Sequence, residues 1–148
     1  LKPGTTGTLR LLRTESDILP VDRETLFELS IASVPSGKVE NQSVKVAMRS
    51  VFKLFWRPEG LPGDPLEAYQ QLRWTRNSQG VQLTNPTPYY INLIQVSVNG
   101  KALSNVGVVP PKSQRQTSWC QAIAPCHVAW RAINDYGGLS AKKEQNLP

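Results

Sequence analysis

Residues 43–58 read SVKVAMRSVFKLFWRP, and this stretch decides the fold that we expect. Its apolar side chains fall on the even positions, interrupted only at Ser50: Val44, Val46, Met48, Phe52, Leu54 and Trp56. Successive side chains of a β-strand point to opposite faces, so a period of two predicts a strand with one apolar face. The other face carries basic side chains, namely Lys45, Arg49, Lys53 and Arg57.

The predicted strand, residues 43–57, is unusually long. At about 3.3 Å per residue it reaches roughly 50 Å, whereas a typical strand has about five or six residues. We therefore expect it to cross from one domain into the next. Its regular apolar face and basic second face suit pairing with another chain. The plainer interpretation is a core strand that continues into a linker.

Composition favours an all-β protein. The 148 residues have room for one domain or two small ones, and 12 Pro and 10 Gly lie in short clusters typical of frequent turns. No apolar run approaches the roughly twenty residues of a membrane helix, so no membrane insertion is expected. The formal net charge is +6. Because the Lys and Arg residues are scattered, they predict a solvated basic surface and no nucleic-acid site.

A boundary is predicted at residues 58–65, PEGLPGDP, because three prolines cannot continue a central strand. It divides the chain into residues 1–58 and 59–148. Before it we expect strands at residues 8–13, 25–32 and 43–57. After it we expect six or seven strands, with a hairpin turn at Asn99-Gly100 and a return strand at residues 101–109. The second part has the size of an immunoglobulin-like sandwich, whereas the first is too short to close one.

Catalytic and metal sites are not indicated. His127 is the only histidine, and no Gly-x-Ser-x-Gly motif accompanies it. Cys120 and Cys126 are expected to pair in an oxidising compartment and to remain thiols in a reducing one. The two cysteines and one histidine lack the fourth ligand of a zinc site. We expect a protein that is not an enzyme and needs no cofactor or metal.

Five blocks of sequence, taken together, resemble one family. They are residues 1–4 (LKPG) leading to 9–13 (LRLLR), 19–27 (LPVDRETLF), 52–58 (FKLFWRP), 85–90 (NPTPYY) and 133–138 (INDYGG). Their order and spacing are similar to those of the periplasmic chaperones of the chaperone–usher pathway, which assemble pili. The short loop at residues 34–42 resembles the subclass with a short loop before its last strand.

The resemblance implies a fold and partners. It implies two immunoglobulin-like β-sandwiches, here an incomplete N-terminal one followed by a complete C-terminal one. The chain begins at Leu1 and has its only methionine at Met48, so we expect a processed chain or a fragment that lacks the start of its first domain. The implied partners are pilus subunits and an outer-membrane usher, and the implied location is the periplasm.

The resemblance also implies roles for named residues. Val44, Val46 and Met48 match the alternating side chains that fill the groove of a pilus subunit, which is donor-strand complementation. Lys53 matches the basic residue that anchors the C-terminal carboxylate of the subunit. Glu24, Arg57 and Asp135 match an ion-pair cluster between the two domains. The disulfide expected between Cys120 and Cys126 is not part of the common motif.

Two alternatives stay open at the level of sequence. An immunoglobulin-like interaction module could use the same strand on a different partner, which need not present a free C-terminal carboxylate. A truncated, non-functional product would expose sheet edges and aggregate.

Overall fold

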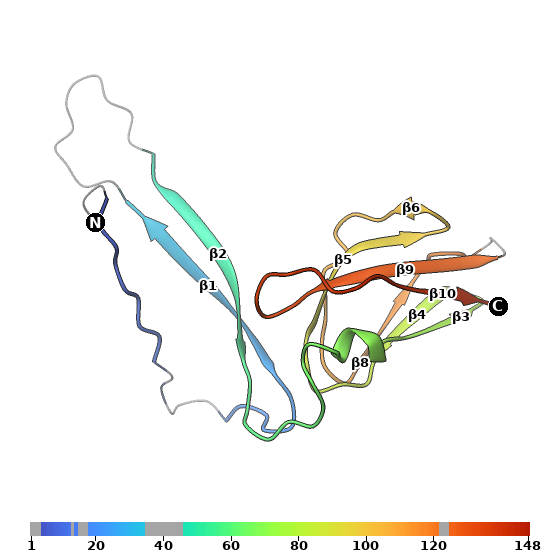
Figure 1. Ribbon diagram of the computed structural model, residues 1–148, viewed down its shortest axis with the longest axis horizontal. Coiled ribbons are helices and arrows are strands. Elements are labelled where there is room, and N and C mark those ends of the chain that lie inside the picture. Colours follow the sequence, from blue (N-terminus) through green and yellow to red (C-terminus); the bar gives the residue numbers. More distant parts are fainter. Residues whose placement is uncertain (1–3, 13, 15–17, 35–45, 122–124) are drawn as a thin grey trace.

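The computed structural model of the protein describes residues 4–12, 14, 18–34, 46–121 and 125–148. The described part contains ten strands and one short 3-10 helix. Two of the strands form a sheet before Pro58, and the other eight form two sheets after it (Figure 1). No helix of these described residues is long and apolar enough to cross a membrane.

The first sheet is a two-stranded ribbon of β1 (Thr25–Ser33) and β2 (Met48–Trp56). The strands pair antiparallel, from Thr25 opposite Trp56 to Ser33 opposite Met48. Figure 1 shows this ribbon as an extended arm beside the larger body of the protein. The alternation of apolar and polar side chains therefore predicts both strands of the ribbon, because cross-strand partners share a face.

Two predictions for the first part of the chain need correction. The long strand begins at Met48 and not at residue 43: Val46 is described but lies outside any strand, and residues 35–45, including Val44 and most of the short loop, lie outside the described residues. The strand predicted at residues 8–13 is wrong, since residues 8–12 adopt no regular structure. Leu9, Leu11 and Leu12 do not keep a period of two, and all three are exposed.

The eight strands after Pro58 form a sandwich of two antiparallel sheets. One sheet contains β3 (Arg73–Asn77), β4 (Gly80–Asn85) and β8 (Ser113–Thr117). The other contains β5 (Ile91–Val98), β6 (Lys101–Ala102), β7 (Val108–Val109), β9 (Cys126–Ile133) and β10 (Lys143–Leu147). A 3-10 helix, η1 (Ala68–Gln71), precedes β3. This is the all-β, immunoglobulin-like fold that the sequence predicts.

Turn chemistry explains where the strands of this sandwich reverse. Val98 pairs with Lys101, and the two residues between them, Asn99 and Gly100, have φ values of 48° and 77°. Positive φ at both positions is what a two-residue type I′ hairpin turn requires. The return strand predicted at residues 101–109 is wrong as one element. It is split into β6 and β7, because Asn105 and Gly107 also take positive φ and interrupt the ladder.

The core of the sandwich is built around three tryptophans. Trp74 of β3 lies with its ring 5.2 Å from that of Trp130 and 6.1 Å from that of Trp119. Trp74 is 2% exposed and Leu83 is fully buried. Each large apolar side chain buried in this way contributes about 1.5–3 kcal/mol to folding.

A buried asparagine holds the turn that follows β4. The Nδ2 of Asn85 donates to the carbonyls of Tyr89 (2.8 Å) and Pro110 (2.9 Å). Its Oδ1 accepts from the amide of Thr87 at 3.0 Å and from the Thr87 hydroxyl at 2.8 Å. Buried polar groups are stable only when they are hydrogen-bonded in this manner. The network fixes the backbone that leads into Tyr90, which faces the ribbon.

Candidate functional site

The ribbon presents one apolar face to the outside of the described structure. The pairing places on this face Phe27, Leu29, Ile31, Phe52, Leu54 and Trp56, which we call the apolar face of the ribbon. Phe52 is 51% exposed, and the other large side chains here are also incompletely covered. Leu11, Leu12 and Leu19 line an open pocket together with Phe27, Leu54 and Trp56. Leu11, Leu12 and Leu19 thus lie beside this face, and none of the three belongs to a strand.

The predicted donor residues lie at the outer end of β2. Met48 opens the strand opposite Ser33, and the pairing puts its side chain on the same side as Phe52. Val46 is 67% exposed and Met48 is 68% exposed. Val44 lies outside the described residues. Two apolar side chains of the predicted series are therefore freely accessible to another molecule.

Lys53 lies on the other face of the ribbon. It stands opposite Glu28 in the pairing, and both side chains are exposed. Lys53 lies five positions after Met48 along the extended strand, a distance of about 17 Å. A partner strand that ends near Lys53 would thus reach Met48 and Val46 with the residues before its end.

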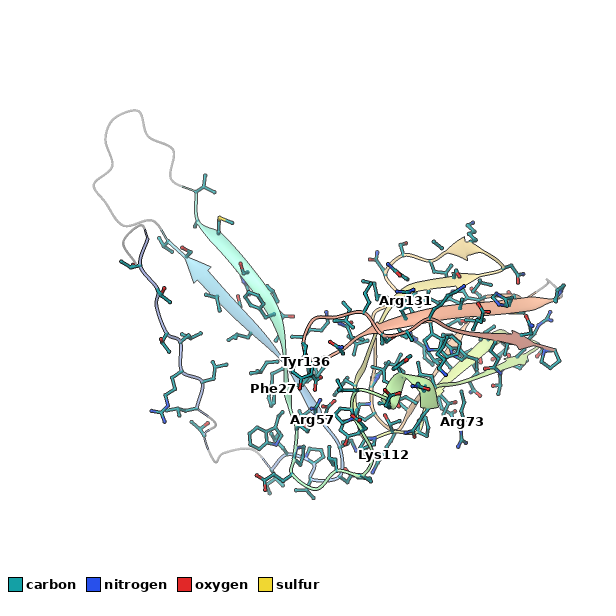
Figure 2. All side chains as sticks on the ribbon, viewed as in Figure 1. Phe27, Arg57, Arg73, Lys112, Arg131 and Tyr136 are labelled. Atoms are coloured by element: carbon teal, nitrogen blue, oxygen red, sulfur yellow. A yellow bond between two sulfur atoms is a disulfide. The ribbon has the colours of Figure 1, made fainter. Side chains whose placement is uncertain are left out.

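The three residues of the predicted ion-pair cluster come together at the junction between ribbon and sandwich. Figure 2 labels Arg57 at this junction. The Nε of Arg57 donates to Glu24 at 2.7 Å, and its Nη1 donates to Asp135 at 2.7 Å. Glu24 also accepts a hydrogen bond from the backbone amide of Tyr90 at 2.6 Å. Arg57 therefore connects the start of β1 to the turn that follows β9.

The two carboxylates of this cluster lie in different environments. The Glu24 side chain is 2% exposed, whereas that of Asp135 is 47% exposed. The hydrogen bond to Asp135, and to a smaller extent that to Glu24, raises the pKa of Arg57 above its ordinary value. Arg57 also lies 5.3 Å from the ring centre of Tyr89, within cation–π distance. Removing Arg57 would leave Glu24 as a buried carboxylate without a cation.

Local sequence explains how Asp135 is presented to Arg57. The side-chain Oδ1 of Asn134 accepts from the amides of Tyr136 (3.1 Å) and Gly138 (2.8 Å). Asparagine side chains commonly stabilise tight turns by such bonds. Gly137 adopts a φ of 77°, which completes the turn without strain. The sequence INDYGG is thus a turn that places one carboxylate at the junction.

A second contact across the junction was not predicted from the sequence. Asp22, just before β1, accepts a hydrogen bond from Lys112 of the sandwich at 2.7 Å and from Arg23 at 2.9 Å. Arg23, and then Lys112, hold the pKa of Asp22 well below its ordinary range. Nothing in the local pattern pairs Asp22 with Lys112, because 90 residues separate them.

An aromatic contact also crosses the junction. The rings of Phe55 in β2 and Tyr90 lie 5.4 Å apart at an angle of 44°. The sequence does not predict this contact. Tyr90 directly follows the turn held by Asn85, and Phe55 lies at an odd position of its strand, on the face that carries the basic side chains. Aromatic pairs of this geometry contribute about 0.5–1.5 kcal/mol beyond the area they bury.

The cysteines and the histidine form no catalytic arrangement in the described part of the chain. Cys120 and Cys126 are joined in a disulfide, with their Cα atoms 5.8 Å apart, at the start of β9. The described residues contain no group of three or more His, Cys, Asp or Glu side chains that could hold a metal ion. The Nε2 of His127 lies 3.9 Å from the carboxylate of Glu144, too far for a hydrogen bond.

The chain matches two protein-family models. Residues 67–144 match the C-terminal domain of the pili assembly chaperone PapD, and residues 1–62 match the PapD N-terminal domain of pili and flagellar-assembly chaperones. The probable fimbrial chaperone protein ElfD of Escherichia coli K12 is 39% identical over 139 residues, which cover 93% of this chain and 59% of ElfD. The chaperone protein FimC of the same strain is 34% identical, over 92% of this chain and 57% of FimC.

Solved structures show the same likeness. A chain of the Salmonella enterica complex of the SafA pilin with the SafB chaperone superposes with a TM-score of 0.76 at 30% identity, covering 89% of this chain and 64% of that one. The E. coli chaperone DraB gives a TM-score of 0.74 at 32% identity, over 88% of this chain and 62% of DraB. This chain thus spans less than two thirds of the length of these relatives. From the family models and these identities, the chain belongs to the family of pili assembly chaperones.

Proposed function

We propose that this protein is a periplasmic chaperone that binds a pilus subunit by donating the outer end of β2 to it. The single observation that carries the proposal is the exposure of Val46 and Met48 at the outer end of β2. The pairing puts the side chain of Met48 on the apolar face of the ribbon, together with the later apolar side chains of the strand. An extended strand of this kind completes the sheet of a subunit that lacks one strand of its own.

Apolar burial would supply most of the binding free energy. Val44, Val46 and Met48 would each contribute about 1.5–3 kcal/mol on entering an apolar groove, before the costs of association. Main-chain hydrogen bonds would cap the open edges of the subunit at the same time. The protein would act by binding alone, without a catalytic step, ATP or a metal.

Lys53 would fix the register of this pairing. Its ammonium group would anchor the C-terminal carboxylate of the subunit, as the family resemblance implies. A slip by one residue would turn every apolar side chain of the donor strand away from the groove. The exposure of Lys53 on the ribbon supports this role, because a carboxylate can approach it from outside.

We further propose that the division between the two family domains lies at Pro58, with residues 1–58 in the first and 59–148 in the second. The cluster of Glu24, Arg57 and Asp135 would hold the two domains at a fixed angle. Delivery of the bound subunit to an outer-membrane usher belongs to the same proposal and rests on the family resemblance.

Subunit capture by a donor-strand variant tests the proposal. Val46→Asp is expected to abolish co-purification with a strand-deficient pilus subunit, because it places an unpaired charge in an apolar groove. Val21→Asp is the matched control, since Val21 is also exposed but lies before β1, outside the donated strand and away from Lys53 in the sequence. Capture that survives Val46→Asp, or that is lost equally with Val21→Asp, would contradict the groove assignment.

The role of Lys53 is tested by changing the C-terminus of the pilus subunit. A subunit with an amidated C-terminus is expected to bind the wild-type protein more weakly than the free carboxylate does. Against Lys53→Ala the two subunits should bind equally, because the group that distinguishes them is gone. Equal binding of both subunits to the wild-type protein would remove Lys53 from the proposal and leave the donor strand in place.

A further inference from the structure

A pocket on the sandwich, away from the ribbon, is lined by an arginine with two hydrogen-bond donors that have no partner in the described part of the chain. The pocket has a volume of about 450 Å³. It lies between the edge strands β6 and β8, beneath the loop that joins β6 to β7. Figure 1 shows β6 and β5 as a hairpin at the edge of the sandwich. No part of the proposed chaperone function uses this surface.

Arg115 lies at the base of this pocket. It is the central residue of β8, and its side chain turns inward between the two sheets. The Nη1 of Arg115 donates to the carbonyl of Val106 at 2.7 Å. The Nε and Nη2 atoms are buried, and neither has a hydrogen-bond partner among the described residues. Burial lowers the pKa of Arg115, but the guanidinium remains charged.

The two unused donors have a specific geometry. Nε–H and Nη2–H are the parallel pair on one edge of a guanidinium, and a carboxylate accepts from such a pair with both of its oxygens. A buried donor without a partner costs about as much as a lost hydrogen bond. A carboxylate at this edge would satisfy both donors and the buried positive charge together.

The rest of the pocket adds an apolar surface beside that position. Leu103, Val106 and Trp119 line it and pack against the core of the sandwich. Lys101 lies at the exposed rim and adds a second positive charge. The described lining contains no acidic side chain. Charge and shape together favour a ligand that carries a carboxylate next to an apolar group.

We propose that the pocket around Arg115 binds such a carboxylate, in a bidentate hydrogen bond to Nε and Nη2. Because both atoms are covered in the structure, the loop at residues 103–107 shifts outward to admit the ligand. The loop is attached at its ends, through Leu103 N to Val96 O (2.8 Å) and Leu93 N to Gly107 O (3.1 Å). Its middle is held through Val106 by Arg115 itself.

Titration of the isotope-labelled protein with phenylacetate tests this site, with neutral phenylacetamide as the matched ligand. Phenylacetate is expected to shift the Arg115 Nε–H resonance and the amides of residues 103–106 in a saturable manner. Phenylacetamide should not do so, because it cannot accept with two charged oxygens. Equal shifts from both ligands, or no saturable shift from phenylacetate, would overturn the proposal.

Variants separate the Arg115 site from general attraction to a basic protein. Arg115→Gln should weaken phenylacetate binding about tenfold or more, the effect of losing charge-assisted hydrogen bonds. Arg73→Gln, an exposed arginine on the other edge of the same sheet, should leave affinity unchanged. An equal loss in both variants would mean that anions associate with the surface in general.

A further variant keeps the test informative if Arg115→Gln disturbs the fold. Lys101→Glu leaves the hydrogen bond between Arg115 and Val106 in place and should weaken phenylacetate binding by charge repulsion at the rim. Unchanged affinity in this variant would contradict the placement of the ligand. A peptide that ends in phenylalanine with a free carboxylate distinguishes the source of the ligand: tighter binding than phenylacetate indicates a polypeptide C-terminus, and weaker binding indicates a small acid.

Discussion

The ribbon and the sandwich are built from similar strands, yet they bury their apolar faces to very different extents. In the sandwich, Trp74 and Leu83 are almost completely enclosed by the facing sheet. In the ribbon, Phe52 and Leu54 alternate just as regularly but remain substantially exposed. A period of two therefore determines which face of a strand is apolar, and it does not determine what covers that face.

The largest expected difference between the two regions is the cost of removing an apolar side chain. Leu83→Ala should lower the free energy of unfolding by about 2–5 kcal/mol, because it opens a cavity in a packed core. Phe52→Ala should cost about 1 kcal/mol or less, the scale of one cross-strand pair. Urea unfolding followed by tryptophan fluorescence measures both. Equal costs would mean that the apolar face of the ribbon is enclosed as completely as the core.

Substitutions at the junction between the two regions are expected to change the free energy of unfolding by an intermediate amount. Arg57→Ala should cost about 1–3 kcal/mol, because it leaves the buried carboxylate of Glu24 without its cation. Asp135→Asn should cost less than about 1 kcal/mol, since this carboxylate is half exposed and its ion pair is screened by water. Thermal unfolding of the two variants provides the comparison. A larger loss for Asp135→Asn would assign the stabilisation to the exposed arm of the cluster.

The smallest effect concerns the ion pair between Asp22 and Lys112. Arg23 and Lys112 keep the pKa of Asp22 in the folded protein below its ordinary value of 3.8. Near and below pH 3.8 the unfolded chain therefore binds more protons than the folded protein does. The stabilisation that Asp22 contributes is thus present above about pH 3.8 and is lost as the pH falls below that value. Asp22→Asn should flatten the acid side of the stability profile slightly, measured as urea midpoints from neutral to acidic pH.

A salt titration sharpens the same comparison. Asp22 and Lys112 are both exposed enough for solvent ions to reach them. High salt should reduce the difference between the wild-type protein and Asp22→Asn, and it should change the effect of Leu83→Ala little, because apolar packing is not screened. An acid profile that is identical in the wild-type protein and Asp22→Asn would show that this contact contributes nothing to the junction.

Local patterns were sufficient where the physical cause is local. The alternation in residues 25–32 and 43–57 predicts both strands of the ribbon, although the second begins only at Met48. The dipeptide Asn99-Gly100 predicts the turn between β5 and β6 of the sandwich, because few residues tolerate positive φ. The prediction of a strand at residues 8–13 was wrong because its physical cause is not local. A strand needs a partner for its hydrogen bonds, and the leucines of this segment do not reveal whether one is available.

The site residues also divide into those that local sequence motifs reveal and those that only the folded structure reveals. The apolar series that ends in Val46 and Met48 and the charged residues Glu24, Arg57 and Asp135 are visible in sequence motifs. The contact of Asp22 with Lys112 and the unused donors of Arg115 are not, because each depends on residues that only the folded backbone brings together. Burial and charge pairing are properties of neighbours in space, and spacing along the chain does not encode them.

The sequence by itself thus determined the all-β class, the faces of the strands, the positions of the main turns and the family resemblance. These follow from backbone geometry and from side-chain chemistry within a few residues. Only the tertiary structure decided that Glu24 is enclosed while Asp135 remains half exposed, and that Arg115 lines a pocket with two buried donors that have no hydrogen-bond partner among the described residues. Which groups lose contact with water is set by packing between distant segments, and that loss decides the strength of every charged contact described above.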